Sequence, residues 1–339
     1  MPSQDSYTVV AVDAMGGDYA PANVVAGAID ALREAGGRFG IALVGQRDAI
    51  EAELRGQPCP AGCTIVHASE VITMDDAPTA ALKTKRDSSI SVGLGMVRDG
   101  SAHAFVSAGN TGAVFSASTL VLGRLEGVGR PTIGALIPTA VKPCLLLDAG
   151  ANVDCRPDHL FEFGVMGSVF MTTMQGCSSP RVGLLNIGEE KSKGGEVVQE
   201  AYARLASSSL NFAGNVEGRD VLTGSVDVVV CDGFVGNVLL KFGESIPGFL
   251  KSRFTNLAAR SLKGKLVGLV ARNSLRSVMK ELDYQEYGGV PVLGVKGVSI
   301  IGHGGSTPKA IKNMIFRAEE MVTRRLPANI QDAIRTQHA

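Results

Sequence analysis

The segment that most constrains the fold of this chain is Val226-Asp-Val-Val-Val-Cys-Asp-Gly-Phe-Val-Gly-Asn237. Apart from Asp227, its first six residues are apolar and mostly β-branched, which is typical of a buried strand in a parallel sheet. Asp232-Gly233 follows this strand at once, and a helical pattern begins near Val238. Ligands of open α/β sheets bind beyond the carboxyl ends of the strands, where helix N-termini offer free N–H groups. The segment therefore predicts an α/β fold with a ligand site at a strand end.

Strand and helix patterns alternate along the whole chain, and several strands end in glycine and polar residues. No shift in composition marks a linker between domains. We therefore expect a single α/β domain at 1–330, with a three-layer, doubly wound and mostly parallel sheet. A helical hairpin is expected to protrude at about 240–283, and residues 331–339 are expected to form a tail. The predicted strands are 7–13, 41–44, 64–67, 103–106, 133–138, 144–147, 181–186, 210–214, 226–231, 292–295 and 298–301.

Charge and composition argue against several classes of protein. The chain has 33 basic and 33 acidic residues, so no excess of positive charge points to nucleic acid. The N-terminus lacks the pattern of a signal peptide, and no apolar run reaches the roughly 20 residues that span a bilayer. The scattered cysteines favour reduced thiols in the cytoplasm over a disulfide framework, although Cys59 and Cys63 lie close together. No spacing of Cys and His residues fits a metal site.

The loop that follows the predicted strand at 103–106 suits an anion. Ser107, Asn110 and Thr111 offer polar side chains, and Gly109 and Gly112 offer backbone N–H groups. At a helix N-terminus these groups could bind phosphate without the lysine of a P-loop. An ordinary capped strand-to-helix turn would have the same residues, so both interpretations stay open.

Two other glycine loops carry polar side chains of interest. Lys191 and Lys193 follow the strand at 181–186, where either could be a functional cation or simply a solvated side chain. His303 and Ser306 lie in a candidate substrate loop after the last strand, where a His–Ser dyad is a further hypothesis. The motifs of P-loops, serine hydrolases, zinc proteases and C-x-x-C redox proteins are absent. A reaction in which phosphate is itself the nucleophile needs none of them.

The segment 247–280 is strongly basic, with eight Lys and Arg residues and no Asp or Glu. Its central part has the spacing of an amphipathic helix. Such a helix suits an anionic membrane surface or an acidic protein partner. Packing against the core or a dimer mate, with solvated lysines, is the alternative. The residues of this candidate membrane or partner surface are Leu262, Lys263, Lys265, Leu266, Leu269 and Val270.

Six motifs together resemble those of the PlsX family of bacterial phosphate acyltransferases, in order from about residue 7 to residue 325. They are Val12-Asp-Ala-Met-Gly-Gly-Asp18, Val106-Ser-Ala-Gly-Asn-Thr-Gly-Ala113, Leu147-Asp-Ala-Gly-Ala-Asn152, Asn186-Ile-Gly-Glu-Glu189, Asn215-Val-Glu-Gly-Arg-Asp220 and Cys231-Asp-Gly-Phe-Val-Gly-Asn237.

The resemblance implies a fold similar to phosphotransacetylases and isocitrate dehydrogenases. It implies transfer of a long acyl chain from acyl carrier protein to inorganic phosphate, which gives acyl phosphate for phospholipid synthesis. It further implies a cytoplasmic homodimer that works without metal or other cofactor and contacts the inner face of the cell membrane through its helical projection. A short-chain phosphotransacetylase that uses acyl-coenzyme A is the alternative. A nicotinamide dehydrogenase would need a dinucleotide fingerprint, and none is found.

The resemblance also assigns site residues. Lys193 and Asn237 match functional residues of the family and would polarise the thioester carbonyl or stabilise the oxyanion that forms from it. The choice between Lys191 and Lys193 stays open. Asp232 would orient Lys193 or take up a proton, or it is simply a helix cap. The loop 107–112 would hold the phosphate.

Overall fold

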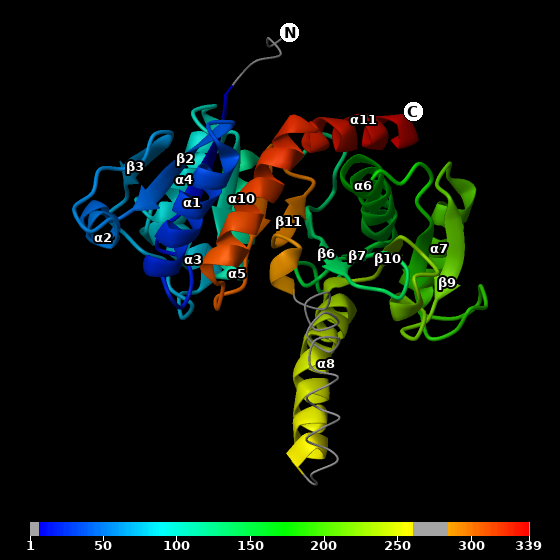
Figure 1. The fold of residues 1–339 in the computed structure, drawn as a ribbon. Coiled ribbons are helices and arrows are strands. Elements are labelled where there is room, and N and C mark those ends of the chain that lie inside the picture. Colours follow the sequence, from blue (N-terminus) through cyan, green and yellow to red (C-terminus); the bar gives the residue numbers. More distant parts are fainter. Residues whose placement is uncertain (1–6, 260–283, 339) are drawn as a thin grey trace.

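The computed structural model describes residues 7–259 and 284–338. The strands are β1 (Thr8–Asp13), β2 (Phe39–Gly45), β3 (Cys63–His67), β4 (Ala104–Ser107), β5 (Thr132–Ile133), β6 (Ala135–Ile137), β7 (Cys144–Leu147), β8 (Val182–Leu185), β9 (Phe212–Val216), β10 (Val228–Val230), β11 (Val290–Leu293) and β12 (Val298–Ile301). They form two sheets, with the orders β3-β2-β1-β4-β12-β11-β5 and β6-β7-β10-β8-β9. Figure 1 shows the two sheets side by side.

The helices are α1 (Ala22–Ala35), α2 (Arg47–Glu53), α3 (Pro78–Thr84), α4 (Ser89–Arg98), α5 (Thr111–Ala117), α6 (Pro157–Gln175), α7 (Glu196–Ser207), α8 (Gly233–Ala259), α10 (Pro308–Thr323) and α11 (Leu326–His338). A π-helical turn, η1 (Ser118–Leu122), continues α5, and two short 3-10 turns are η2 (Val221–Thr223) and η3 (Tyr284–Glu286).

Most strand pairs are parallel, as the sequence predicts. The antiparallel pairs are β11 with β12, β11 with β5, and β6 with β7. The chain enters β1 from the upper side of Figure 1, and α8, which follows β10, leaves from the lower side. The carboxyl ends of the parallel strands of both sheets therefore lie on the same side of the molecule, where the polar loops of the sequence are expected to meet.

Helices cover both faces of the larger sheet, which confirms the doubly wound α/β class. Successive side chains of a strand point to opposite faces. Val10 and Val12 of β1 accordingly belong to an apolar cluster with residues of α1 and α10, whereas Ala11 belongs to a second cluster with residues of α4 and α5. In the smaller sheet, α6 packs on β10 and β7.

The strand predicted at 133–138 is divided between the two sheets at Gly134. β5 pairs with β11 in the larger sheet, and β6 pairs with β7 in the smaller one. A Cβ atom at Gly134 would lie 3.2 Å from the side chains of both Leu145 and Leu147. A residue without a side chain therefore lets the chain pass from one sheet to the other. That the two sheets act as one domain stays a prediction.

The C-terminal end is a helix and not the predicted tail. Leu326, Ile330 and Ile334 are four residues apart, so they lie on one face of α11. All three are at most 1% exposed and belong to the apolar cluster that includes α6. The buried face holds α11 on the body, so the prediction of a tail from residue 331 is wrong.

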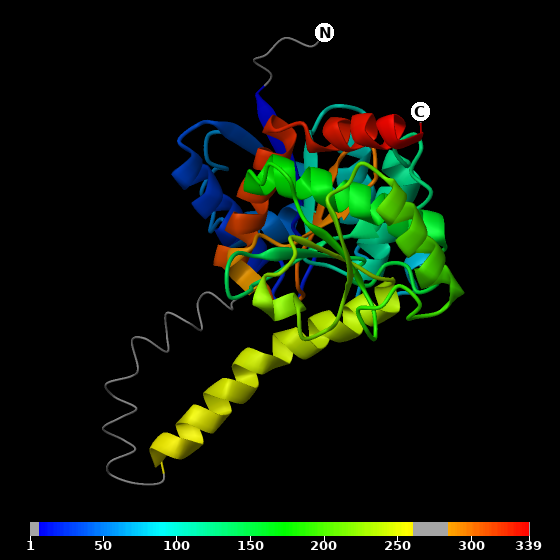
Figure 2. The ribbon, with the colours of Figure 1, turned by 90° about the vertical axis from the view of Figure 1, so that its right-hand side faces the viewer.

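The first part of the predicted projection is α8, which extends away from the body (Figures 1 and 2). The second part of the predicted hairpin, with the whole candidate surface Leu262–Val270, lies outside the described residues. Within the described ranges, no helix is long and apolar enough to cross a membrane.

The cysteines match the sequence prediction only in part. Cys59 and Cys63 form a disulfide, with Cα atoms 5.7 Å apart, where the sequence favours reduced thiols. Cys63 is the first residue of β3, and Cys59 lies in the loop before it. The remaining cysteines are free thiols, namely Cys144, Cys155, Cys177 and Cys231.

Candidate active site

A buried carboxylate and a hydroxyl join the ends of β1 and β4. The Ser107 hydroxyl donates to the carboxylate of Asp13 at 2.6 Å, and both side chains are at most 2% exposed. Burial raises the pKa of Asp13. Hydrogen bonds from Ser107, Ser89 and the backbone N–H groups of Met15 and Gly16 act in the opposite direction and lower this pKa in part. Asp13, which lies in the first of the six quoted motifs, therefore ties two strand ends together.

The same contact uses the groups of Ser107 and Gly109 that were predicted to bind phosphate. The N–H of Gly109 donates to Ser107 Oγ at 3.0 Å. A Cβ atom at Gly16 would lie 2.5 Å from the Asp13 carboxylate and 2.8 Å from the N–H of Gly109, so these loops are in close contact. Ser107 and Gly109 thus shape the strand end, and in this arrangement neither polar group is left for an anion.

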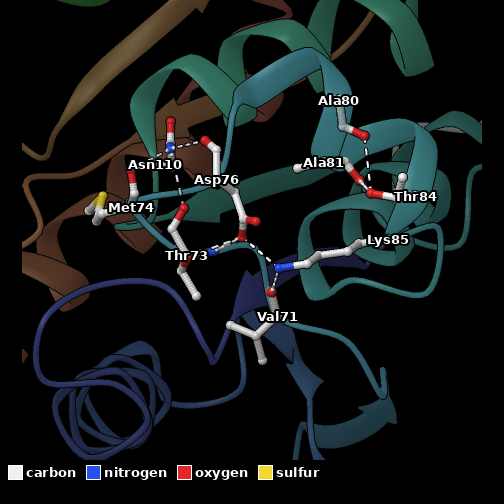
Figure 3. A network of polar contacts seen from close by, with 9 residues as sticks. All are labelled: Val71, Thr73, Met74, Asp76, Ala80, Ala81, Thr84, Lys85 and Asn110. Carbon is white, nitrogen blue, oxygen red and sulfur yellow. Dashed lines mark hydrogen bonds and ion pairs between the residues drawn. The ribbon is translucent and has the colours of Figure 1, made fainter.

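Asn110 likewise bonds to the protein itself (Figure 3). Its side-chain oxygen accepts an N–H from the first turn of α5 at 3.1 Å, which makes it the helix N-cap. Its amide nitrogen lies 3.3 Å from the carbonyl oxygens of Thr73, Met74 and Asp76. The Asp76 carboxylate in turn accepts from Lys85 at 2.6 Å. Asn110 therefore holds the loop before α3 against the start of α5.

Thr111 and Gly112 are the members of the predicted cradle that keep free groups. Thr111 is exposed, and its hydroxyl has no hydrogen-bond partner within the part of the chain that the structure describes. The first N–H groups of a helix have no partner inside it. The N–H groups of Thr111 and Gly112 are among these, so α5 still offers donors to an anion.

The loop after β12 meets the same strand ends. The N–H of Gly302 donates to the carbonyl of Ser107 at 2.7 Å, and the N–H of Asp18 donates to the carbonyl of Gly304 at 2.8 Å. The loops after β1, β4 and β12 are therefore one cluster, which places the candidate substrate loop beside the predicted phosphate loop.

The structure does not show the His–Ser dyad that the sequence suggests. The Ser306 hydroxyl donates to the backbone carbonyl of His303 at 2.6 Å, not to its ring. His303 Nδ1 accepts the N–H of Gly305 at 3.1 Å. Both side chains thus stabilise the turn of their own glycine loop, and a dyad between them is wrong for this arrangement.

A second buried carboxylate organises the end of β7 in the smaller sheet. Asp148 is fully buried and accepts the N–H groups of Gly150 at 3.1 Å, Ala151 at 3.0 Å and Asn152 at 2.6 Å. It also accepts from the Asn152 side chain at 2.7 Å. Burial raises the pKa of Asp148, whereas these hydrogen bonds lower it in part. Sequence reasoning gave Asp148 no role, although it lies in one of the six quoted motifs.

This loop supports the first turn of α8. The N–H of Gly233 donates to the carbonyl of Asn152 at 2.7 Å. A Cβ atom at Gly150 would lie 3.3 Å from Asn237, whose side chain therefore rests on the loop. Asn237 is exposed, and its carboxamide has no hydrogen bond to any residue in the described ranges. It is thus a free donor on a firmly held backbone.

Asp232 is the cap of α8. Its carboxylate accepts the N–H of Val235 at 2.8 Å, so the helix begins at Gly233 and not near Val238, as the sequence predicts. Of the three roles considered for Asp232, the structure shows that of a helix cap. No hydrogen bond or ion pair joins it to Lys193 within the described part of the chain.

Side-chain amides hold the loop between β8 and α7. Asn186 donates to the carbonyl of Lys193 at 3.0 Å, and Asn215 donates to the carbonyl of Glu190 at 2.9 Å. Gln199 donates to two further carbonyls of the loop, each at 2.9 Å. Sequence reasoning missed these supports, although Asn186 and Asn215 begin two of the quoted motifs.

The two candidate lysines of this loop have different surroundings. The ammonium group of Lys191 lies 5.9 Å from the centre of the Tyr202 ring, a cation–π contact. The Lys193 side chain passes over Gly188, where a Cβ atom would lie 3.1 Å from its Cγ. Its ammonium group is exposed and has no hydrogen-bond or ion-pair partner among the described residues. Lys193 thus keeps a free ammonium group, and its role stays a prediction.

The cysteines near the second cluster are poor nucleophiles. Burial raises the pKa of Cys155 to about 12, with the carboxylates of Asp148 and Asp232 adding to the effect. Burial also raises the pKa of Cys231 well above its usual value. Because the thiolate is the reactive form, these environments do not favour covalent catalysis by cysteine.

The described residues show no group of three or more His, Cys, Asp or Glu side chains that could hold a metal ion. What the two clusters offer instead is hydrogen-bond donors: the start of α5 at the larger sheet, and the carboxamide of Asn237 and the ammonium group of Lys193 at the smaller sheet. These are groups that bind a phosphate and stabilise an oxyanion.

Comparison with known proteins agrees with this chemistry. Residues 8–329 match the model of a family described as "Fatty acid synthesis protein". The phosphate acyltransferase of Pelotomaculum thermopropionicum is 48% identical over 325 residues, which cover 96% of this chain and 94% of that protein. The phosphate acyltransferase of Heliobacterium modesticaldum is 49% identical over 327 residues, covering 96% and 97%.

Solved structures show the same fold in more distant proteins. The EutD phosphotransacetylase from Staphylococcus aureus has a TM-score of 0.60 at 12% identity and covers 93% of this chain and 94% of its own. A phosphotransacetylase from Streptococcus pyogenes has a TM-score of 0.62 at 15% identity and covers 94% of each chain. At these identities the likeness is one of fold, and it confirms the predicted phosphotransacetylase-like architecture.

Proposed function

The chain belongs to this family of phosphate acyltransferases and is an acyltransferase, and we propose that it transfers a long acyl chain from acyl carrier protein to inorganic phosphate. A phosphate oxygen attacks the thioester carbonyl carbon and forms a tetrahedral intermediate. The carbon–sulfur bond then breaks, the electron pair leaves with sulfur, and the thiolate takes a proton from solvent. The products are acyl phosphate, for phospholipid synthesis, and free acyl carrier protein.

The observation that carries the mechanism is the free, exposed carboxamide of Asn237 on a rigid support. A preorganised donor stabilises an oxyanion without reorganising during the reaction. Asn237 has this property because the loop of Asp148 and the cap of Asp232 fix the first turn of α8. In the proposal, Asn237 and Lys193 donate to the developing oxyanion.

Phosphate binds in the proposal at the start of α5. The free donors there are the Thr111 hydroxyl and the N–H groups of Thr111 and Gly112. Ser107 and Asn110 act indirectly, since their hydrogen bonds shape the strand end and cap the helix. Asp232 acts in the same way at α8, where its carboxylate caps the helix.

We extend the proposal to the partners of the enzyme. The segment 247–280 has eight basic residues and no acidic ones, so it attracts an acidic acyl carrier protein and an anionic membrane surface. The part of this segment that the structure describes, 247–259, lies in the projecting helix α8, which supports peripheral contact with the inner face of the cell membrane from the cytoplasm (Figure 2). The enzyme acts as a homodimer in this proposal.

A short-chain phosphotransacetylase that uses acyl-coenzyme A is the second candidate, and the fold likeness to phosphotransacetylases favours keeping it. Phosphate-dependent thiol release separates the two. We expect phosphate to release the thiol of acyl carrier protein from palmitoyl-acyl carrier protein. We expect little release of coenzyme A from palmitoyl- or acetyl-coenzyme A. Release from acetyl-coenzyme A alone would establish the phosphotransacetylase instead.

A further inference from the structure

Helix α8 exposes large apolar side chains, and the first of them lie next to the proposed oxyanion donor. Phe234, Val238, Phe242 and Phe249 are each more than half exposed in the single chain. Exposed aromatic side chains in such number on one helix are unusual for a surface that meets only water. Something apolar is expected to cover them.

These four side chains share one face of the helix. At 100° per residue they fall within a sector of about 80°, because they are spaced at i, i+4, i+8 and i+15. Asn237 lies about 60° to one side of Phe234 on the same turn. The apolar stripe of α8, defined as Phe234, Val238, Phe242 and Phe249, therefore begins beside the carboxamide of Asn237.

The length of the stripe is informative. From Phe234 to Phe249 the helix rises about 22 Å, which is about the length of an extended palmitoyl chain. Exposed apolar residues also lie on the loops that follow β7 and β8, the two parallel neighbours of β10, with Val153 at 62% and Ile187 at 83% exposure. Ile187 lies in the Lys193 loop, and Val153 follows the Asp148 loop.

We propose that the apolar stripe of α8 is the surface along which the acyl chain of the thioester lies, and that its residues set the preference for long chains. The inference rests on the proposed function, because it takes the thioester carbonyl to lie at Asn237. The acyl chain is the part of the substrate bonded directly to that carbonyl, so it must leave the site from there. The stripe begins beside that point, and Ser245 is the polar residue that falls on its face between Phe242 and Phe249.

Substitution of Phe242 by serine tests the proposal, because it removes a large apolar side chain from the stripe. Phe254→Ser is the matched control on the same helix. Phe254 is 47% exposed but lies about 120° around the helix from Phe242. Each buried methylene contributes about fourfold to binding. We expect Phe242→Ser to lower kcat/KM for palmitoyl-acyl carrier protein by about tenfold or more and for butyryl-acyl carrier protein by less than twofold. Phe254→Ser should change neither value.

Two further measurements on the same variants identify a different occupant. Equal loss for both chain lengths, together with dissociation of a dimer in light scattering, would assign the stripe to a second copy of this chain. Loss of binding to vesicles of phosphatidylglycerol, without a change in chain-length preference, would assign it to the membrane. Either result overturns the acyl-chain proposal. An unmodified protein without phosphate-dependent product from either chain length would instead overturn the proposed function.

Discussion

The backbone of Gly236 lies so close to Asp148 that a Cβ atom at position 236 would be 1.8 Å from the Asp148 carbonyl oxygen. No side chain fits in this space, so the first turn of α8 rests directly on the loop after β7. Asn237 is the next residue, and its carboxamide direction depends on this contact. The proposed oxyanion donor is thus positioned by two backbones in contact.

Substitution of Gly236 by alanine is therefore expected to damage both folding and activity. The added methyl group must displace α8 or the Asp148 loop, which costs about 1–3 kcal/mol of unfolding free energy. Denaturant unfolding and phosphate-dependent turnover measure the two effects. Gly243→Ala is the control, because nothing lies within 4 Å of its Cβ position on the same helix. It should be neutral or stabilise by up to about 1 kcal/mol; equal behaviour of both variants would contradict the account.

Lys193→Ala should lower kcat about 100- to 1,000-fold, as the loss of one oxyanion donor typically does. Because the Lys193 side chain is exposed, circular dichroism and thermal unfolding should stay unchanged. Lys191→Ala is the matched control from the same loop, and it should keep activity within a few-fold. The reverse pattern would transfer the role to Lys191.

Asn110 and Thr111 should respond differently to substitution. Asn110→Ala removes a helix cap and the bonds to the loop before α3, so the unfolding free energy should fall by about 1–2 kcal/mol. Thr111→Val removes a free hydroxyl, so the KM for phosphate should rise several-fold with unchanged stability. If Thr111→Val leaves the KM for phosphate unchanged, the anion does not bind at the start of α5.

Alkylation should distinguish the buried thiols from ordinary ones. Burial raises the pKa of Cys144 and of Cys155 to about 12. At pH 8 their thiolate fraction is then about 1,000-fold lower than that of a thiol with a pKa near 9. Iodoacetamide labelling, followed by peptide mass spectrometry, should modify both far more slowly than N-acetylcysteine. Rapid labelling of Cys155 in a protein that stays folded would contradict a raised pKa for this thiol.

The sequence predicts most elements of the fold because buried parallel strands and their glycine-rich ends are local patterns. The break at Gly134 is not local, since it depends on which strands of two sheets pair on either side. Helix α11 was missed, although Pro327 is compatible with the start of a helix. In the structure this proline is the second residue of the helix, a position that proline favours.

The candidate site could be located from the sequence but not resolved into roles. Ser107, Asn110 and Asp232 have the right chemical groups, yet their hydrogen bonds go to the protein itself. Whether a polar group is free or already bonded depends on partners that are distant in the sequence, such as Asp13 for Ser107. The start of α8 was misplaced for a similar reason, since Gly236 is a close-contact residue of a helix and not part of a loop.

The most direct test of the central claim is the transfer of labelled phosphate into an acyl phosphate. The enzyme is incubated with palmitoyl-acyl carrier protein and [32P]phosphate, and the product is extracted and identified by its reaction with hydroxylamine. The account predicts a labelled palmitoyl phosphate that forms in equal amount with free acyl carrier protein. Release of acyl carrier protein without labelled product would show hydrolysis and contradict the account.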